Sequence, residues 1–245
     1  MARNSFQYYP ISFVLMRSYF LLILLFPLIG LAQPDNINKV DEKGRKQGAW
    51  KKSYTSGVVR YTGQFKDDKP IGTFQYFSEF GKKTSEISYK QDTGFATFFH
   101  VNGGVMGKGI YINRAKQGTW KYWDNNGILS SEEEYKNDKL INTRKVYYAG
   151  GGIARTEPYQ DGLINGKVQE FFEEGQLKYE ANYIDGNPDS TVNYFHPNGN
   201  KRIVGRYKDA VRHGKWIYYD ENAKITHWEF YKLGELIKTI KREED

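Results

Sequence analysis

Four histidines are the side chains of this sequence that could most readily bind a metal ion or transfer protons. His100 and His196 fall at equivalent points of a sequence repeat, four units apart, so they should lie far from each other. His213 and His227 are close enough in the chain to approach, but no third ligand accompanies them at the spacing that zinc sites use. We therefore expect exposed turn or strand histidines and no metal site.

Glutamate runs and one glycine-rich segment are the other candidates for chemistry. Glu132-Glu133-Glu134 and Glu173-Glu174 resemble paired carboxylates for acid–base catalysis, but they fit solvated strand edges and turns better. Gly150-Gly151-Gly152 falls where a hairpin turn is expected, with no helix after it, so it does not fit a phosphate-binding loop. Catalysis needs groups that converge on one cavity. We predict a protein that is not an enzyme and has no cofactor, metal ion or small-molecule substrate.

Composition and net charge exclude cysteine chemistry and do not favour nucleic-acid binding. The chain has no cysteine, which excludes disulfides, thiolate metal sites and a cysteine nucleophile. The formal charge is +7, and removal of Arg3 and Arg17 with a leader leaves 7 − 2 = +5. This mild basic excess is spread over interleaved Lys and Glu, so it favours weak attraction to anionic surfaces and does not indicate a nucleic-acid partner.

The N-terminus resembles a secretory signal peptide covering residues 1–32, with an alternative start at Met16. Arg17 supplies the positive charge, an apolar run follows, and Gly30-Leu31-Ala32 supplies the small residues at the cleavage site. The apolar run is shorter than the roughly 20 residues that cross a bilayer comfortably. We predict export to the periplasm, cell surface or medium of a bacterium, and the alternative is an uncleaved N-terminal anchor.

The elements that position all these residues come from a tandem repeat. Its opening residue, position 0, recurs in steps of 24 residues with one step of 22. Position 5 is aromatic in seven of eight units, position 9 is glycine in seven of eight, and position 17 is aromatic in all eight. The opening residues are Gly48, Gly72, Gly94, Gly118, Asn142, Gly166, Ser190 and Gly214.

Each unit is expected to form a β-hairpin. In unit one, Val59, Tyr61, Gly63 and Phe65 alternate with polar residues, which is the pattern of a strand with one buried face. Small residues in the middle of this face leave space for an aromatic ring from a neighbouring strand. The first half of each unit is rich in aromatic and β-branched residues and also predicts a strand. Glycine at position 9 suits the tight turn between them.

One conflict arises within the first strand of each unit. The aromatic residues at positions 2 and 5, such as Trp120 and Trp123, have opposite parity and cannot share a face of a regular strand. Either a bulge lies between them, or both faces of the sheet carry aromatic residues.

These patterns predict an all-β protein: an elongated single-sheet ribbon of about eight tandem antiparallel hairpins over residues 48–236. With strands about 4.8 Å apart, sixteen strands would extend roughly 75 Å. Residues 33–47 form a polar lead-in, and residues 237–245 form a charged tail suited to protecting a sheet edge. The end units are atypical, as expected for an array, because Ser53 replaces an aromatic residue and Ala223 replaces a glycine.

The repeat resembles a known family. Tyr61-Thr62-Gly63-Gln64-Phe65, followed by a short polar turn and Gly72-Thr73-Phe74, is similar to the MORN repeat, and the variant pattern is similar to bacterial YwqK-type antitoxins. The resemblance covers roughly residues 41–235. It implies a ribbon of hairpins with a binding or scaffolding role. The antitoxin label implies a cytoplasmic partner, which conflicts with the signal peptide, and we discount it.

The aromatic ladder is the candidate partner-binding site. Its rings could stack on sugars or hold a partner chain, but we favour packing of the rings against each other, as repeat cores require. Interleaved lysines at Lys51, Lys121, Lys145 and Lys215 could attract anionic lipid, although solvated lysines are the simpler interpretation. The candidate residues are Trp50, Phe74, Trp120, Tyr122, Trp123, Tyr194, Trp216 and Tyr218.

Three functions remain open from the sequence. The first is an exported module that binds another protein, or a second copy of itself, through a face or edge of its sheet. The second is an envelope-surface module that binds anionic lipid or glycan, which dependence on salt and on anionic lipid would reveal. The third is an antitoxin, which predicts a cytoplasmic protein and a toxin encoded alongside.

Overall fold

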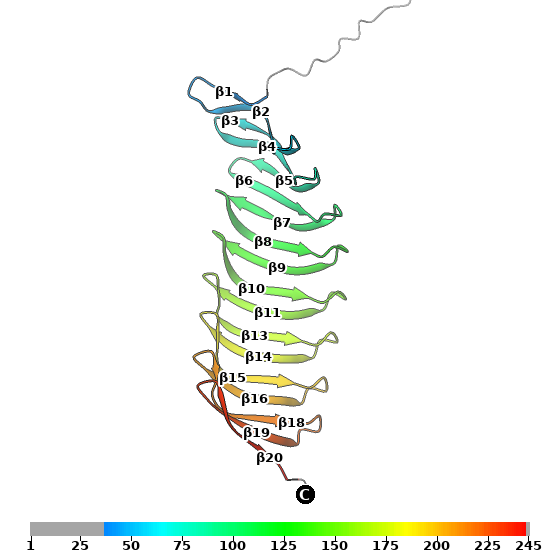
Figure 1. Cartoon of the computed structure of the whole chain (residues 1–245), viewed down its shortest axis with the longest axis vertical. Helices are drawn as coiled ribbons and strands as arrows, with labels where there is room; N and C mark the ends of the chain where they lie inside the picture. Colours follow the sequence, from blue (N-terminus) through cyan, green and yellow to red (C-terminus); the bar gives the residue numbers. More distant parts are fainter. Residues whose placement is uncertain (1–36, 244–245) are drawn as a thin grey trace, which may run out of the picture. The chain divides into compact units, whose positions relative to one another are not determined.

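The computed structural model describes residues 37–243, which form one antiparallel sheet of 20 strands without a helix (Figure 1). The all-β prediction is therefore confirmed. The predicted signal peptide, its alternative start at Met16, the first residues of the lead-in and the last two residues of the tail lie outside the described residues. Across residues 37–243, no helix has the length and apolar character needed to cross a membrane.

Each unit contributes an opening strand and a closing strand. The opening strands are β2 (Lys46–Ser53), β4 (Lys69–Phe77), β6 (Thr93–Phe99), β8 (Ala115–Trp123), β10 (Lys139–Tyr147), β13 (Gly166–Phe171), β15 (Asn187–Phe195) and β18 (Gly214–Tyr219). The closing strands are β3 (Val59–Lys66), β5 (Lys83–Lys90), β7 (Val105–Ile112), β9 (Leu129–Lys136), β11 (Ile153–Gln160), β14 (Leu177–Ile184), β16 (Lys201–Lys208) and β19 (Ile225–Lys232). The short strands β12 (Leu163–Ile164) and β17 (Val211–Arg212) precede β13 and β18, and β1 (Lys39–Val40) and β20 (Glu235–Lys241) lie at the two ends.

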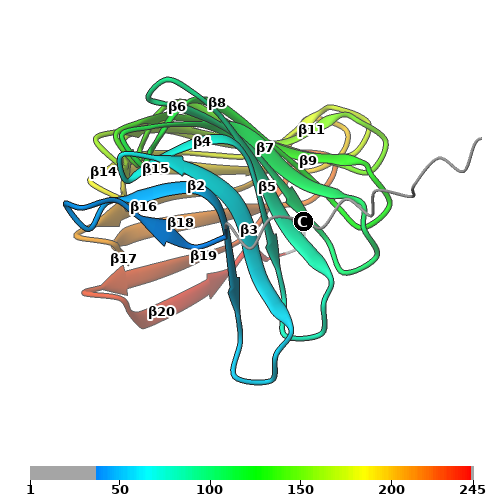
Figure 2. The same ribbon diagram turned by 90° about the horizontal axis from the view of Figure 1, so that it is seen from above.

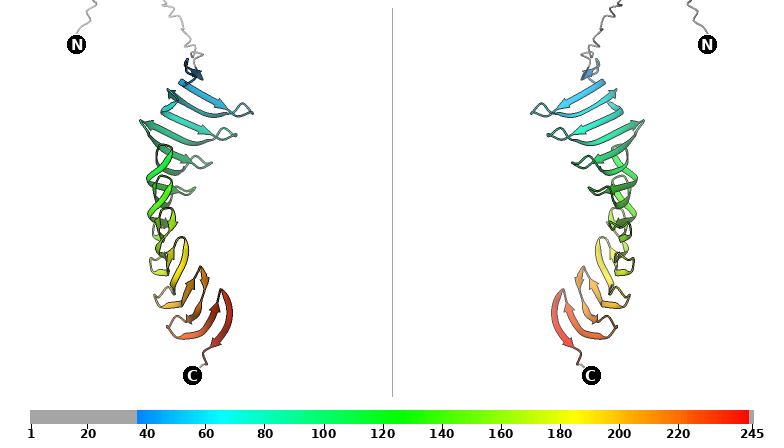
Figure 3. Two further views of the ribbon diagram at one scale, coloured as in Figure 1. Left: turned by 90° about the vertical axis from the view of Figure 1, so that its left-hand side faces the viewer. Right: turned by 90° about the vertical axis from the view of Figure 1, so that its right-hand side faces the viewer.

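The units follow one another along the sheet in chain order. In units one to seven, each closing strand pairs with the opening strand of its own unit and with that of the next unit, always antiparallel. The described array is one layer thick when viewed from the side (Figure 3), and its strand direction rotates along the array when viewed from above (Figure 2), as the twist of open sheets requires. β20 pairs with β19 and carries the array past residue 236 to Lys241.

Two kinds of turn join the strands, both at the predicted places. Between most units two residues take positive φ, such as Asp67 (φ 52°) and Asp68 (φ 64°), which is the geometry of the two-residue hairpin turns that match strand twist. Within units, the residue at position 9 takes positive φ, as at Gly127 (φ 81°). In the last unit Ala223 must adopt the same conformation (φ 60°), although its side chain disfavours it.

A bulge at the opening residue explains the single step of 22 residues. Between unit one and unit two, the pairs Gln64–Ile71 and Thr62–Gln75 leave Gly63 facing three residues that begin with Gly72 (φ 63°). Between unit two and unit three, β5 and β6 pair without a register shift. The shorter unit therefore lacks the two residues that form the bulge elsewhere.

Both faces of the sheet carry aromatic residues. No extra residue separates Trp120 from Trp123 in β8; the register shift between Tyr122 and Trp123 places its extra residue in β9 instead. The position 5 ring of Tyr147 accordingly lies on the opposite face, where its hydroxyl donates to Glu132 Oε2 at 3.0 Å. The second of the two predicted alternatives is correct. We call the face that carries positions 2, 15 and 17 the aromatic face, and the face that carries positions 3 and 14 the polar face.

Candidate binding face

Rings at position 2 form the core of the aromatic face by lying over the closing strand of the preceding unit. A Cβ atom built on Gly109 would lie 2.1 Å from the Trp120 ring, and one on Gly205 would lie 2.2 Å from the Trp216 ring. Both tryptophans are 0% exposed. Glycine at position 15 is therefore required by the next unit's ring, which confirms that small residues in this strand make space for a neighbouring aromatic ring.

Where position 15 is not glycine, the residue opposite it at position 2 of the next unit is smaller than an aromatic residue, or it is charged. Ala181 lies opposite Val192, and Ile87 lies opposite Ala96, so the combined volume stays similar while the two residue types change. Phe74 repeats the glycine arrangement, with a Cβ on Gly63 only 2.3 Å from its ring. Packing between units is thus specified pair by pair.

In the middle of the aromatic face the rings give way to a ladder of charges. Arg144 contacts Glu133 (Nε to Oε1, 3.0 Å) and Glu157 (Nη1 to Oε2, 3.1 Å), and Arg155 contacts Glu157 (Nε to Oε1, 2.7 Å) and Glu170 (Nη1 to Oε1, 2.5 Å). Burial of the Arg144 guanidinium disfavours its charged form and lowers its pKa. Attraction to Glu133 and Glu157 outweighs this effect, so the pKa of Arg144 is raised. The five side chains form one continuous network across β9 to β13.

This ladder corrects the interpretation of the glutamate run. Glu133 was expected to be solvated, but its side chain is only 11% exposed and is held by Arg144 and by the hydroxyl of Tyr135. Burial and the hydrogen bond to Glu133 raise the pKa of Tyr135. Sequence reasoning missed Arg144, Arg155, Glu157 and Glu170. The signal that could have revealed Arg144 was the replacement of glycine by Glu133 at position 15 together with an arginine at position 2 of the next unit.

A basic residue lies over each tryptophan at position 2. Lys46 Nζ is 5.0 Å from the ring centroid of Trp50, Lys116 Nζ is 4.6 Å from that of Trp120, and the Arg212 guanidinium carbon is 4.3 Å from that of Trp216. All three cations lie two residues before the opening glycine, in the regularly paired residues that precede it. Cation–π attraction at such sites contributes about 0.5–2 kcal/mol.

Half-buried tyrosines flank the buried rings. Tyr122 stacks on Trp120 (centroids 6.3 Å apart, interplanar angle 24°), and Tyr194 contacts Tyr179 (5.0 Å). Burial, with the nearby Tyr207, raises the pKa of Tyr194 to about 12. Burial and a hydrogen bond to Glu229 raise the pKa of Tyr218. Among residues 37–243, the main contacts between elements are those of strands adjacent in the sheet, and Figure 3 shows no second layer over this face.

The eight predicted binding residues divide into three groups. The rings of Phe74, Trp120 and Trp216 are buried and occupied by packing. Those of Trp50, Tyr122, Tyr194 and Tyr218 are half-buried on the same face. Trp123 lies on the polar face. Binding by the half-buried group stays a prediction, whereas the buried rings could reach a partner only through a change in the sheet.

The four predicted lysines lie on the polar face, and two of them already have partners. Lys121 Nζ lies 2.6 Å from Glu132 Oε1, and Lys215 Nζ lies 4.9 Å from the ring centroid of Trp228. Pairing of Lys121 lowers the pKa of Glu132, mainly through the hydrogen bond between them. The local field at Lys121 is therefore weaker than the count of lysines suggests.

Histidines hold units together. His100 Nε2 lies 2.9 Å from the carbonyl oxygen of Trp123, and His196 Nε2 lies 3.0 Å from that of Tyr219, so each imidazole donates to the following unit. His227 stacks on Tyr218, with centroids 4.1 Å apart. Within the described part of the chain, no group of three or more His, Cys, Asp or Glu side chains could hold a metal ion.

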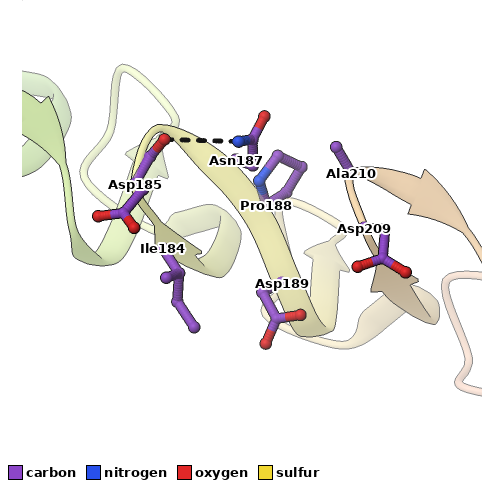
Figure 4. A pocket seen from close by; sticks show the side chains of 7 residues that line it. All are labelled: Ile184, Asp185, Asn187, Pro188, Asp189, Asp209 and Ala210. Carbon is purple, nitrogen blue, oxygen red and sulfur yellow. Dashed lines mark hydrogen bonds between the residues drawn. The ribbon is translucent and has the colours of Figure 1, made fainter.

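An open hollow of about 470 Å³ lies between the turn that follows unit six and the turn that follows unit seven (Figure 4). Asp185, Asp189 and Asp209 line it, and Figure 4 shows their carboxylates spread along the hollow rather than converging on one point. The Asn187 amide donates to the carbonyl oxygen of Asp185 at 3.4 Å. This arrangement lacks the convergent groups of a catalytic site.

Comparison with known proteins bears on the repeats directly. The model of the MORN repeat variant family matches residues 46–67, 70–91, 116–137 and 164–185. No curated protein matches the sequence. Among solved structures, a porin-like protein from Bacteroides uniformis ATCC 8492 is 8% identical, with 77% of this chain and 92% of that chain covered and a TM-score of 0.21. The four matched segments are MORN repeats of the variant form, and the other four units share their repeat phase and hairpin geometry.

Proposed function

We propose that this protein is an exported, non-enzymatic module that binds another protein on its aromatic face. The observation that carries the proposal is that the half-buried rings of Tyr122, Tyr194 and Tyr218 lie beside the buried rings, and no second layer covers them within residues 37–243. Tyrosine and arginine are the residue types that most often supply binding energy at protein interfaces, because each combines a large apolar surface with a polar group. Arg144 and Arg155 lie at the centre of this face, and each side chain is about a third exposed, so both guanidinium groups can contact a partner.

Preorganisation supports this choice of face. Tyr122 and Tyr218 are fixed by stacking and hydrogen bonds, so little side-chain entropy remains to be lost when a partner binds. A single-layer sheet also offers a long surface, which suits an extended partner or a scaffold for several partners. Export rests on the leader sequence alone, and the absence of an enzymatic role rests on the lack of converging groups in the described array.

The test compares partner capture by the wild-type protein with capture by Tyr122→Ser/Tyr194→Ser. Both side chains are half-buried, so their removal should leave the buried rings in place, which circular dichroism and the melting temperature will verify. We expect a partner cross-linked from the envelope fraction to be lost with the double variant and retained by Thr73→Ala, a matched change on the polar face.

Retention of the same partner by the folded double variant would refute the aromatic face as the binding site. Co-sedimentation with anionic vesicles that is lost at high salt would favour the envelope-surface alternative instead. Recovery of a toxin encoded beside the protein would favour the antitoxin alternative.

A further inference from the structure

One ladder of cross-strand neighbours runs along the centre of the polar face and changes character near its end. From unit one to the start of unit seven every residue in it is polar or charged, and on β16, β18, β19 and β20 every residue is apolar. The polar part is Lys51, Thr62, Gln75, Glu86, Thr97, Lys108, Lys121, Glu132, Lys145, Thr156, Gln169, Glu180 and Asn193. The apolar part, which we call the apolar stripe, is Val204, Ile217, Trp228 and Ile240.

The fold does not require apolar residues in the stripe. At the positions equivalent to Ile217 and Trp228, unit six carries Gln169 and Glu180, and the same hairpin forms there. The core of the last units lies on the other face, where Trp216 is buried over Gly205. The stripe residues are only partly buried, and within residues 37–243 no element covers them. Their apolar character therefore needs an explanation outside the packing of the array.

Basic residues border the stripe on one side. Arg206, Lys215 and Lys238 each lie two residues from a stripe residue on the same strand, and Phe230 lies between the last two across the sheet. All three cations are exposed, and among the described residues none of them forms an ion pair. A second copy of the chain would bring basic border against basic border, so charge disfavours self-association through this surface.

From this arrangement we propose that the apolar stripe with its basic border binds an amphipathic α-helix whose apolar face is flanked by acidic residues. The stripe runs across the strands with a side chain about every 4.8 Å. Successive turns of an α-helix repeat every 5.4 Å, so a helix lying along the stripe places one apolar side chain near each strand. Acidic residues on its flank then face Arg206, Lys215 and Lys238.

This surface is distinct from the aromatic face, on the other side of the sheet, and the two can fail independently. The probe is a pair of synthetic helical peptides that share one apolar face and carry either glutamate or lysine on the flank. Fluorescence anisotropy with the purified protein should detect binding of the acidic peptide only. Ile217→Gln/Trp228→Glu, which copies the residue types of unit six, should weaken that binding at least about tenfold.

Two further variants define the border and the control. Lys215→Glu/Lys238→Glu should also weaken binding of the acidic peptide about tenfold, with loss of its salt dependence, whereas Lys108→Glu on the same face should leave it unchanged. Melting temperatures should show that all variants fold. The proposal is overturned if the folded Ile217→Gln/Trp228→Glu variant binds the acidic peptide as tightly as the wild type does, or if both peptides bind alike. It is also overturned if this variant loses binding to anionic vesicles but retains binding to the peptide. Tyr122→Ser/Tyr194→Ser should bind the acidic peptide normally, which separates this surface from the aromatic face.

Discussion

Contact between Gly109 and Trp120 offers the sharpest test of how neighbouring units recognise each other. Gly109 does not have a positive φ, so alanine fits its backbone conformation, and the effect of the replacement comes from steric overlap of the new methyl group. The new Cβ would lie 2.1 Å from the ring, against about 3.5 Å for an ordinary carbon contact, so the ring or the strand must move by about 1.4 Å. Overpacking of this kind costs about 1–3 kcal/mol.

The matching change is Trp120→Val, which should cost about 3 kcal/mol because it leaves a cavity in the buried face. The double variant Gly109→Ala/Trp120→Val recreates the pair that Ala181 and Val192 form elsewhere in the array. We therefore expect it to be more stable than the sum of the single changes predicts, by about 1–3 kcal/mol.

Guanidinium chloride unfolding followed by circular dichroism measures the three free energies. Gly152→Ala is the control, because a Cβ there would meet its nearest atom at 3.6 Å, an ordinary contact, and should change stability by less than about 0.5 kcal/mol. Pairwise packing between units would be refuted if the loss of stability of the double variant equals the sum of the two single losses within about 0.5 kcal/mol. An unchanged unfolding midpoint for Gly109→Ala would refute it as well.

Three further outcomes follow from the same geometry. Lys116→Met should lower the free energy of unfolding by about 1 kcal/mol, since it removes the cation over Trp120, and an unchanged urea midpoint would contradict this. Ala223→Gly should raise it by about 1 kcal/mol by relieving an unfavourable positive φ, and a lower melting temperature would show that the turn is unstrained. Burial raises the pKa values of Tyr76 and Tyr194 from 10.0 to about 12, so their contribution to stability is complete below pH 10 and is lost as the pH rises through about 12. Melting temperatures and phenolate absorbance between pH 8 and pH 12 will test this, and phenols that ionise near pH 10 in the folded protein would contradict it.

Repetition made the fold predictable, because each local signal occurs eight times in the same phase. Glycine at position 9 and polar pairs such as Asp67-Asp68 marked the turns, and alternation around Tyr61 and Phe65 marked the closing strand. The charge ladder could not be found in this way. Glu133 and Arg144 each look like surface residues when considered alone, and only their cross-strand contact shows that they replace a ring and a glycine.

The sequence by itself determined the hairpin unit, its turns and its order along the array, because these depend on contacts between residues close in the chain. Tertiary structure decided which face each side chain takes and what lies opposite it. The extra residue of the bulge lies in β9 and not in β8, so strand alternation leaves Trp120 and Trp123 on opposite faces. The pairing of separate units aligns Val204, Ile217, Trp228 and Ile240 into one stripe. Such alignments depend on strand register, which bulges shift by whole residues, so only the folded sheet shows which side chains become neighbours.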